Sequence, residues 1–296
     1  MSTVALEPGL ATAPGRARTL RQLAALETRR FARHPLFLMG VLLTVAASLG
    51  GAERTTSTFL LVIVPAAGLG VLGLVAMAGL ARTSRTLSRS AGAPPVPERT
   101  QTAALALACL LPFAVGVVWS VWAIWADQHH ATPANGFPFG SVSDGWRAAV
   151  LFGEAAMASL GGPLLGLVIG RWLPRRGTAP LAAVLLVAAV IVMQGLFEPL
   201  RRIRVVMPWT YFGGPAGIPG DDMRMLQYAG SPQWWVAYLV CLCGLAVVAA
   251  LWHDPEARGP RLRAVGAVLV VAAVVTCLLA MTTGLDSTLV NPLPSS

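Results

Sequence analysis

Histidine and intramembrane carboxylate groups, the side chains best suited to acid–base or metal chemistry, are scarce in this 296-residue chain. His129, His130, Asp144 and Glu154 are the four that could form one cluster. Imidazole and carboxylate groups exchange protons and bind metal ions, so one hypothesis is a membrane enzyme acting on lipid-linked substrates there. The histidines and Asp144 lack an ordered ligand spacing, however, and no H-E-x-x-H or G-x-S-x-G motif is present. We therefore expect neither a catalytic nor a metal site.

Glu154 is the only acidic residue well inside a long apolar run, seven positions after Arg147. On a helix this spacing places it roughly 10 Å below the outer end. An intramembrane carboxylate typically faces a polar cavity or a partner, which makes Glu154 a candidate for a transport pathway or gate. The alternative is a protonated carboxyl, or one that reaches interfacial water, without such a role.

All 22 strongly basic residues are arginines, because the sequence contains no lysine. A Walker A loop needs a lysine that reaches the nucleotide phosphates, and retinal or pyridoxal Schiff bases need one as well. Any energy from ATP must therefore come through another chain, and we expect no cofactor bound by this one. The arginines flank apolar runs, so their expected partners are anionic lipid headgroups and not nucleic acid.

The composition is that of a membrane protein, with 55% hydrophobic and only 12% charged residues and a mean hydropathy of +0.67. Seven apolar runs have about the 20 residues that a membrane-spanning helix needs. They predict an all-α, polytopic membrane helical bundle of six to seven transmembrane helices, between a disordered tail (1–17) and a short C-terminal tail (284–296). The predicted spans are 35–52, 58–81, 102–126, 148–173, 179–197, 234–252 and 264–282.

Arginine counts predict the orientation of these spans. The connections on the side of the N-terminus hold 16 arginines and the opposite connections hold six. Because basic residues accumulate on the cytoplasmic side, we expect a cell-membrane protein with a cytoplasmic N-terminus. Tryptophans near span ends predict an interfacial aromatic belt: Trp119, Trp122, Trp125, Trp234 and Trp235 outside, with Trp172 and Trp252 inside.

An amphipathic helix is predicted over residues 18–34, immediately before Pro35. Apolar residues share one of its faces, and Arg21, Arg29, Arg30 and Arg33 lie largely around the other. Such a helix lies in the membrane interface. It is either a plain basic anchor or an elbow that turns the chain into the first span and contacts a cytoplasmic partner.

The inner connection 82–101 carries Arg82, Arg85 and Arg89 at roughly one-turn spacing, and prolines then break the helix. Glu98 and Arg99 lead into the next span. The interpretation without a specific function is a charged loop between two spans. The functional interpretation is a short helix that projects as a rigid knob and docks a separate ATPase.

Gly162, Gly166 and Gly170 recur once per turn in the fourth predicted span. Glycines at this spacing let another helix approach closely. We expect packing within the chain here, in preference to a dimer interface. The four cysteines fall inside apolar runs, so we expect small hydrophobic residues there and no disulfide framework.

Three segments resemble the permease subunits of ATP-binding-cassette exporters of the type-two permease class, particularly the small actinobacterial ones. They are LETRRFARHPLFLMG (26–40), PPVPERTQTAALALACLLP (94–112) and LWHDPEARGPRLRAVGAVLVVAAVV (251–275). In such permeases the third of these segments corresponds to an additional C-terminal span.

The resemblance implies a permease that pairs with a second copy or a related chain and with two cytoplasmic ATPase subunits, which bind the ATP. The elbow would be 18–34, a coupling helix would lie within 82–99, and re-entrant outer helices would form a cap in 198–233. The chain departs from the pattern because 82–97 contains no acidic residue. A further alternative is a scaffold or sensor that works without an ATPase and whose outer cap binds a ligand.

Overall fold

A computed structural model of the protein describes residues 13–52, 61–90, 96–129, 143–193, 207, 213–216, 224–227, 229–285 and 289–290. Side chains are described for most of these residues. The exceptions are 13–16, 51–52, 85–90, 127–129, 213–216, 224–227 and 289–290.

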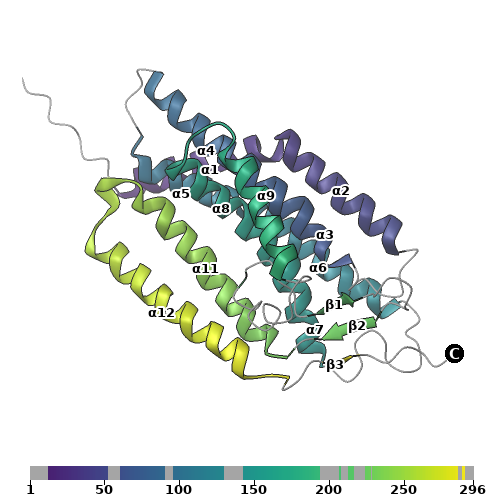
Figure 1. The fold of residues 1–296 in the computed structure, drawn as a ribbon. Helices are drawn as coiled ribbons and strands as arrows, with labels where there is room; N and C mark the ends of the chain where they lie inside the picture. Colours follow the sequence, from purple (N-terminus) through teal and green to yellow (C-terminus); the bar gives the residue numbers. More distant parts are fainter. Residues whose placement is uncertain are drawn as a thin grey trace, which may run out of the picture.

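The described residues form an all-α bundle of long helices (Figure 1). Its first half comprises α1 (Ala13–Ala32), α2 (Pro35–Ala52), α3 (Ile63–Pro65), the π-helical η2 (Ala66–Val71), α4 (Leu72–Ser90), α5 (Glu98–Ala108) and α6 (Leu110–His129). Its second half comprises α7 (Asp144–Leu151), the π-helical η3 (Phe152–Met157), α8 (Ala158–Trp172), α9 (Thr178–Ile191), α11 (Pro232–Trp252), the 3-10 turn η6 (Pro255–Ala257) and α12 (Pro260–Thr282).

Five helices in the described part of the chain are long and apolar enough to cross a membrane, which is the character of a multi-pass membrane protein. They are Ile63–Ser84, Glu98–Ala126, Asp144–Trp172, Pro232–Trp252 and Pro260–Thr282. Counting α1 and α2 as one broken span gives six. The described part of the run predicted over 179–197 forms α9, an apolar helix of 14 residues, and residues 194–197 lie outside the described residues. Also, α1 begins at Ala13, inside the segment that we expected to be a disordered tail.

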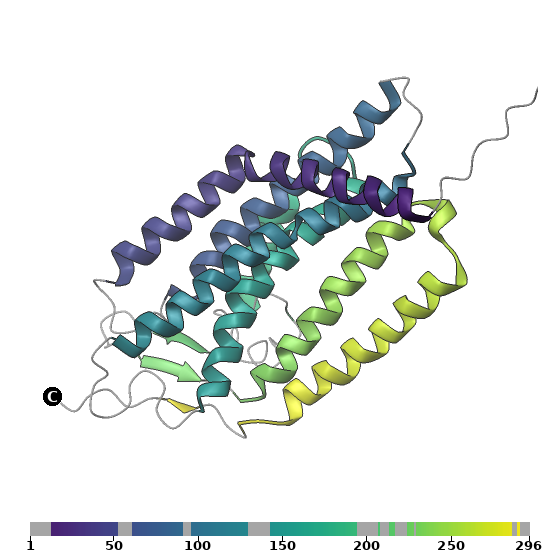
Figure 2. The same cartoon turned by 180° about the vertical axis from the view of Figure 1, so that it is seen from behind.

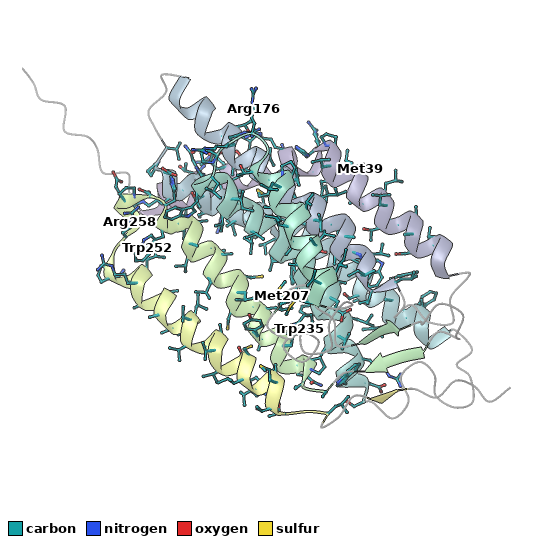
Figure 3. All side chains as sticks on the ribbon, in the orientation of Figure 1. Met39, Arg176, Met207, Trp235, Trp252 and Arg258 are labelled. Atoms are coloured by element: carbon teal, nitrogen blue, oxygen red, sulfur yellow. The ribbon has the colours of Figure 1, made fainter. Side chains whose placement is uncertain are left out.

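The connections on the N-terminal side of the predicted topology meet at one end of the bundle (Figures 1 and 2). This end comprises α1, the C-terminus of α4, the N-terminus of α5, the α8–α9 turn and the α11–α12 turn. Figure 3 places Arg176, Trp252 and Arg258 here, whereas Trp235 lies toward the other end. We call it the arginine-rich end.

The opposite end carries a small antiparallel sheet, formed by described residues of the expected cap and of the predicted C-terminal tail. Strand β1 (Gly213–Ala216) pairs with β2 (Arg224–Gln227), with Gly213 opposite Gln227. Strand β3 (Leu289–Val290), from the predicted C-terminal tail, pairs with β2. The other residues of the expected cap that precede α11, namely 198–206, 208–212, 217–223 and 228, lie outside the described residues. Among the described residues, the pairing of these strands supplies hydrogen-bond partners for backbone groups of this Gly- and Pro-rich connection.

Helix α8 packs through the glycine stripe against the span formed by η2 and α4. A Cβ atom added at Gly162 would overlap the Gly70 carbonyl oxygen, and one at Gly166 would overlap that of Leu74. At Gly170 it would approach the Ala78 carbonyl oxygen to 2.8 Å. The backbones of the two helices are therefore in direct contact, so this stripe packs within the chain.

The expected tryptophan belt is wrong in part, because two of these rings pack in the core. Trp119 is 6% exposed, and its indole N–H donates to Ser48 Oγ at 2.7 Å, which joins α6 to α2. Trp235 is fully buried. Trp125, Trp172 and Trp234 are exposed. An indole can bury its N–H when a polar partner lies within reach, as Ser48 does for Trp119.

Candidate functional site

Helix α1 lies across the arginine-rich end and packs along α5 (Figure 2). The chain bends by 61° between α1 and α2. Phe31 is fully buried at the bend, with its ring 4.9 Å from that of Phe37. The predicted elbow segment is thus anchored to the bundle by an aromatic pair.

His34 occupies the bend itself. Its Nδ1 accepts the backbone N–H of Leu36 at 3.3 Å. Burial lowers the pKa of this imidazole, because the charged form loses its hydration. The neutral form is therefore favoured at neutral pH, and only this form can accept the hydrogen bond.

The predicted elbow arginines differ in their environments. Arg21, Arg29 and Arg33 are exposed. The Arg30 guanidinium instead binds both carboxylate oxygens of Glu27, at 2.8 and 3.0 Å. Glu27 is 7% exposed, so this pair neutralises a charge where α1 meets the bundle. Glu27 and Arg30 also line a pocket of about 160 Å³ with Ser84 of α4 and Gln101 of α5.

The first part of the predicted coupling segment, residues 82–90, belongs to the long helix α4, and residues 91–95 lie outside the described residues. Helix α4 runs without interruption from Leu72 to Ser90, past the hydrophobic part of the span, which ends at Ser84. Arg82 lies in the last turn of the span, directly before this extension, and is partly buried. The side chains of Arg85 and Arg89 lie outside the described residues. A push on this extension would therefore act directly on α4.

Glu98, the first residue of α5, is the centre of a charged cluster at the arginine-rich end. Its Oε1 lies 3.5 Å from Nη1 of Arg171, at the end of α8, and 2.7 Å from Nδ1 of His253, directly after α11. The Arg171 side chain is fully buried, whereas that of Glu98 is 31% exposed. One carboxylate thus joins the ends of three helices.

The next residue strengthens this junction through its backbone. Arg99 N–H donates to Asp254 Oδ2 at 3.1 Å, and Asp254 Oδ1 accepts the N–H of Glu256 at 3.0 Å. Asp254 is 6% exposed. The N-terminus of α5 is therefore fixed to the α11–α12 turn, with the negative carboxylate of Asp254 at the positive end of the helix dipole.

Aromatic contacts close the junction. The Trp172 ring packs edge-on against His253, with centroids 5.4 Å apart, and its indole N–H donates to the Ala249 carbonyl. Arg263 stacks over Trp252 at 5.9 Å. These contacts join the end of α8 to α11 and α12.

Sequence reasoning selected Glu98 and Arg99 but assigned no role to Arg171, His253 or Asp254. One signal was available: Arg171 follows a glycine stripe that has to face another helix. An arginine on or near a buried helix face needs a carboxylate partner, and Glu98 is one of the few acidic residues near that membrane depth.

Glu154 lies in the π-helical segment η3 and is 5% exposed. Of the residues that the enzymatic alternative would place beside Glu154, only Asp144 has a described side chain. The Asp144 side chain is 97% exposed, at the start of α7, and lies 3.6 Å from Arg147. His130 and the side chain of His129 lie outside the described residues. Among described residues, no group of three or more His, Cys, Asp or Glu side chains is arranged to hold a metal ion.

Comparison of the chain with protein-family models, with curated proteins and with solved structures finds no match in any of the three.

Proposed function

We propose that this chain is the membrane permease subunit of an ATP-driven exporter. A separate cytoplasmic ATPase would dock on the arginine-rich end, over α1 and the inner connection 82–101. The permease would pair with a second copy or a related chain to complete the translocation path. The N-terminus would then lie in the cytoplasm, as the 16 arginines on its side of the predicted topology favour.

The observation that carries this proposal is the junction at Glu98. A docked ATPase can drive transport only if motion of the docking surface reaches the helices that line the path. Glu98 and Arg99 end the inner connection and bind α8 and the α11–α12 turn through Arg171, His253 and Asp254. The connection is thus attached to helices far along the chain.

A second route for motion starts at the other end of the same connection. The extension of α4 that carries Arg85 and Arg89 continues directly from the span, which contains Arg82, and that span is in backbone contact with α8 at the glycine stripe. Glu154 lies in the same continuous helix as α8, which is 67% buried over its membrane window. We assign Glu154 to the translocation path on this basis, since α8 receives both routes.

The proposal predicts an ATPase partner that depends on Arg85 and Arg89. We expect the tagged chain, purified from membranes of its native host, to carry a P-loop subunit and ATP hydrolysis. Replacing both arginines by glutamate should remove at least nine tenths of that ATPase activity, because two reversed charges repel an anionic docking surface. The measurement is ATP hydrolysis per mole of purified chain, with the subunit identified by mass spectrometry.

Arg258→Glu with Arg261→Glu is the matched control. It reverses two charges at the same end, directly after η6 and in the first turn of α12, outside the proposed docking surface, and should retain the activity. A chain that purifies intact from its host membranes without any P-loop subunit would contradict the proposal. Equal loss in both double variants would show a general charge effect and would also contradict it.

A further inference from the structure

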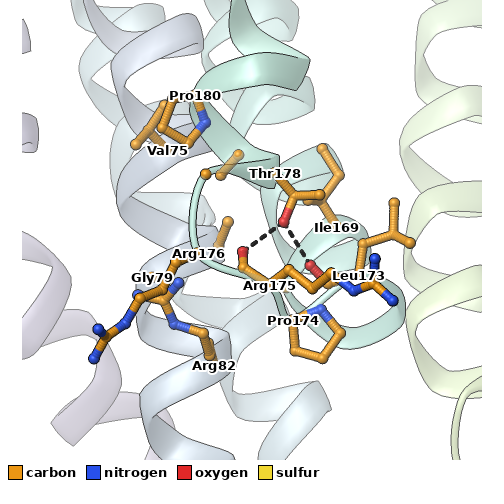
Figure 4. A pocket seen from close by; sticks show the side chains of 14 residues that line it. Val75, Gly79, Arg82, Ile169, Leu173, Pro174, Arg175, Arg176, Thr178 and Pro180 are labelled. Carbon is orange, nitrogen blue, oxygen red and sulfur yellow. Dashed lines mark hydrogen bonds between the residues drawn. The ribbon is translucent and has the colours of Figure 1, made fainter.

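A basic pocket opens at the arginine-rich end, between α4, the end of α8 and the start of α9 (Figure 4). Its volume is about 200 Å³. Arg82 reaches it from α4, and Arg175 and Arg176 belong to the α8–α9 turn. None of the 14 residues that line it is acidic. The chemistry of the pocket therefore favours an anion.

The turn that carries two of these arginines has a defined shape. The Thr178 hydroxyl contacts the carbonyl oxygens of Leu173 and Arg175, at 2.8 and 2.6 Å (Figure 4). Gly177 takes a φ of 94°, which a residue with a side chain adopts only with strain. The turn is thus held in one conformation beside the pocket.

Apolar surface continues from the pocket along α9. Leu181, Val184 and Leu185 are 57%, 64% and 60% exposed. Leu173, at the mouth of the pocket, is 54% exposed. A ligand that places an anionic group among the arginines would therefore have hydrocarbon-compatible surface directly beside it.

We propose that this pocket binds the phosphate headgroup of an anionic phospholipid, with the acyl chains along the exposed face of α9. Basic pockets between membrane helices are suited to such headgroups, since arginine guanidinium groups bind phosphate oxygens through paired hydrogen bonds. Free phosphate shares the headgroup chemistry but gains nothing from α9. The proposal depends on the chain lying in a membrane and not on an ATPase partner.

The test is native mass spectrometry of the purified full chain in neutral detergent, titrated with cardiolipin, phosphatidylglycerol or phosphatidylcholine. We expect bound cardiolipin and phosphatidylglycerol at concentrations where phosphatidylcholine does not bind. Arg175→Gln with Arg176→Gln should weaken cardiolipin binding at least tenfold. The control, Arg29→Gln with Arg33→Gln, removes the same charge from exposed positions at the end of α1 and directly after it, and should change binding less than twofold.

Gly79→Phe tests the pocket without changing the charge. Gly79 lines the pocket, and a Cβ atom added there meets no atom within 4 Å. The phenyl ring should fill the cavity and weaken cardiolipin binding at least tenfold. The substitution should not weaken α4, because every residue other than proline favours a helix more than glycine does. This variant keeps the test decisive if the double arginine variant fails to fold.

Three results would overturn the proposal. Equal weakening by the two double arginine variants would show general surface electrostatics. Unchanged cardiolipin binding by Gly79→Phe would place the lipid elsewhere. Displacement of cardiolipin by an equal concentration of inorganic phosphate would show a free-anion site. None of these results bears on ATPase coupling, because the titration uses the isolated chain.

Discussion

Replacing Glu98 by glutamine should destabilise the bundle by about 3 kcal/mol, because it removes the carboxylate partner of a fully buried arginine. Removing one member of a buried ion pair typically costs 3–5 kcal/mol, and the lower figure applies since Glu98 is 31% exposed. The measurement is the free energy of unfolding of the purified chain in detergent. Arg171→Met should cost less, because the carboxylate that remains keeps His253 and partial hydration.

The double variant Glu98→Gln with Arg171→Met should recover part of the loss, because it no longer leaves the arginine charge buried without its carboxylate. If Arg171→Met instead destabilises the chain more than Glu98→Gln, the arginine acts mainly through packing. The charged junction would then not be the link that we describe between α5 and α8.

Gly166→Leu should destabilise the bundle by a similar amount, about 3 kcal/mol, because the leucine side chain would force α8 away from α4. An added Cβ atom would overlap the backbone carbonyl of Leu74, which cannot move aside as a flexible side chain could. Thermal unfolding in detergent and elution on size-exclusion chromatography would report the change.

Gly79→Ala on α4 is the matched control for this substitution, because its Cβ atom would have open space. It should raise the stability by about 0.5–1 kcal/mol through helix propensity. A Gly166→Leu chain that is as stable as the wild type would show that the two helices are not in backbone contact.

Apolar runs predicted the long helices well because a spanning segment must satisfy its own backbone hydrogen bonds, which leaves a helix as the simplest solution. The contact at the glycine stripe could also be predicted, because the once-per-turn spacing of its glycines is a local feature of the sequence. The strands could not be predicted, because β2 pairs with β3 although α11 and α12 lie between them in the sequence. Strand segments this short carry almost no periodic signal.

The candidate site could be predicted only in part. Glu98 and Arg99 stand out because they follow prolines at a span boundary. Their partners Arg171 and Asp254 come from distant turns, and one sequence does not say which helix ends meet. The environment of Trp119 shows the same limit, because its position near a span end suggested an interface while Ser48 of α2 lies within its reach.

The claim on which the proposed function depends most is that the arginine-rich end faces the cytoplasm. In a chain whose four cysteines are replaced by alanine, single cysteines at Arg21 and at Asp144 would mark the two ends. Both native positions are exposed. A membrane-impermeant maleimide applied to intact cells should label Asp144→Cys, and should label Arg21→Cys only after permeabilisation. Labelling of Arg21→Cys in intact cells, with Asp144→Cys protected, would place the docking surface away from ATP and contradict the proposed function.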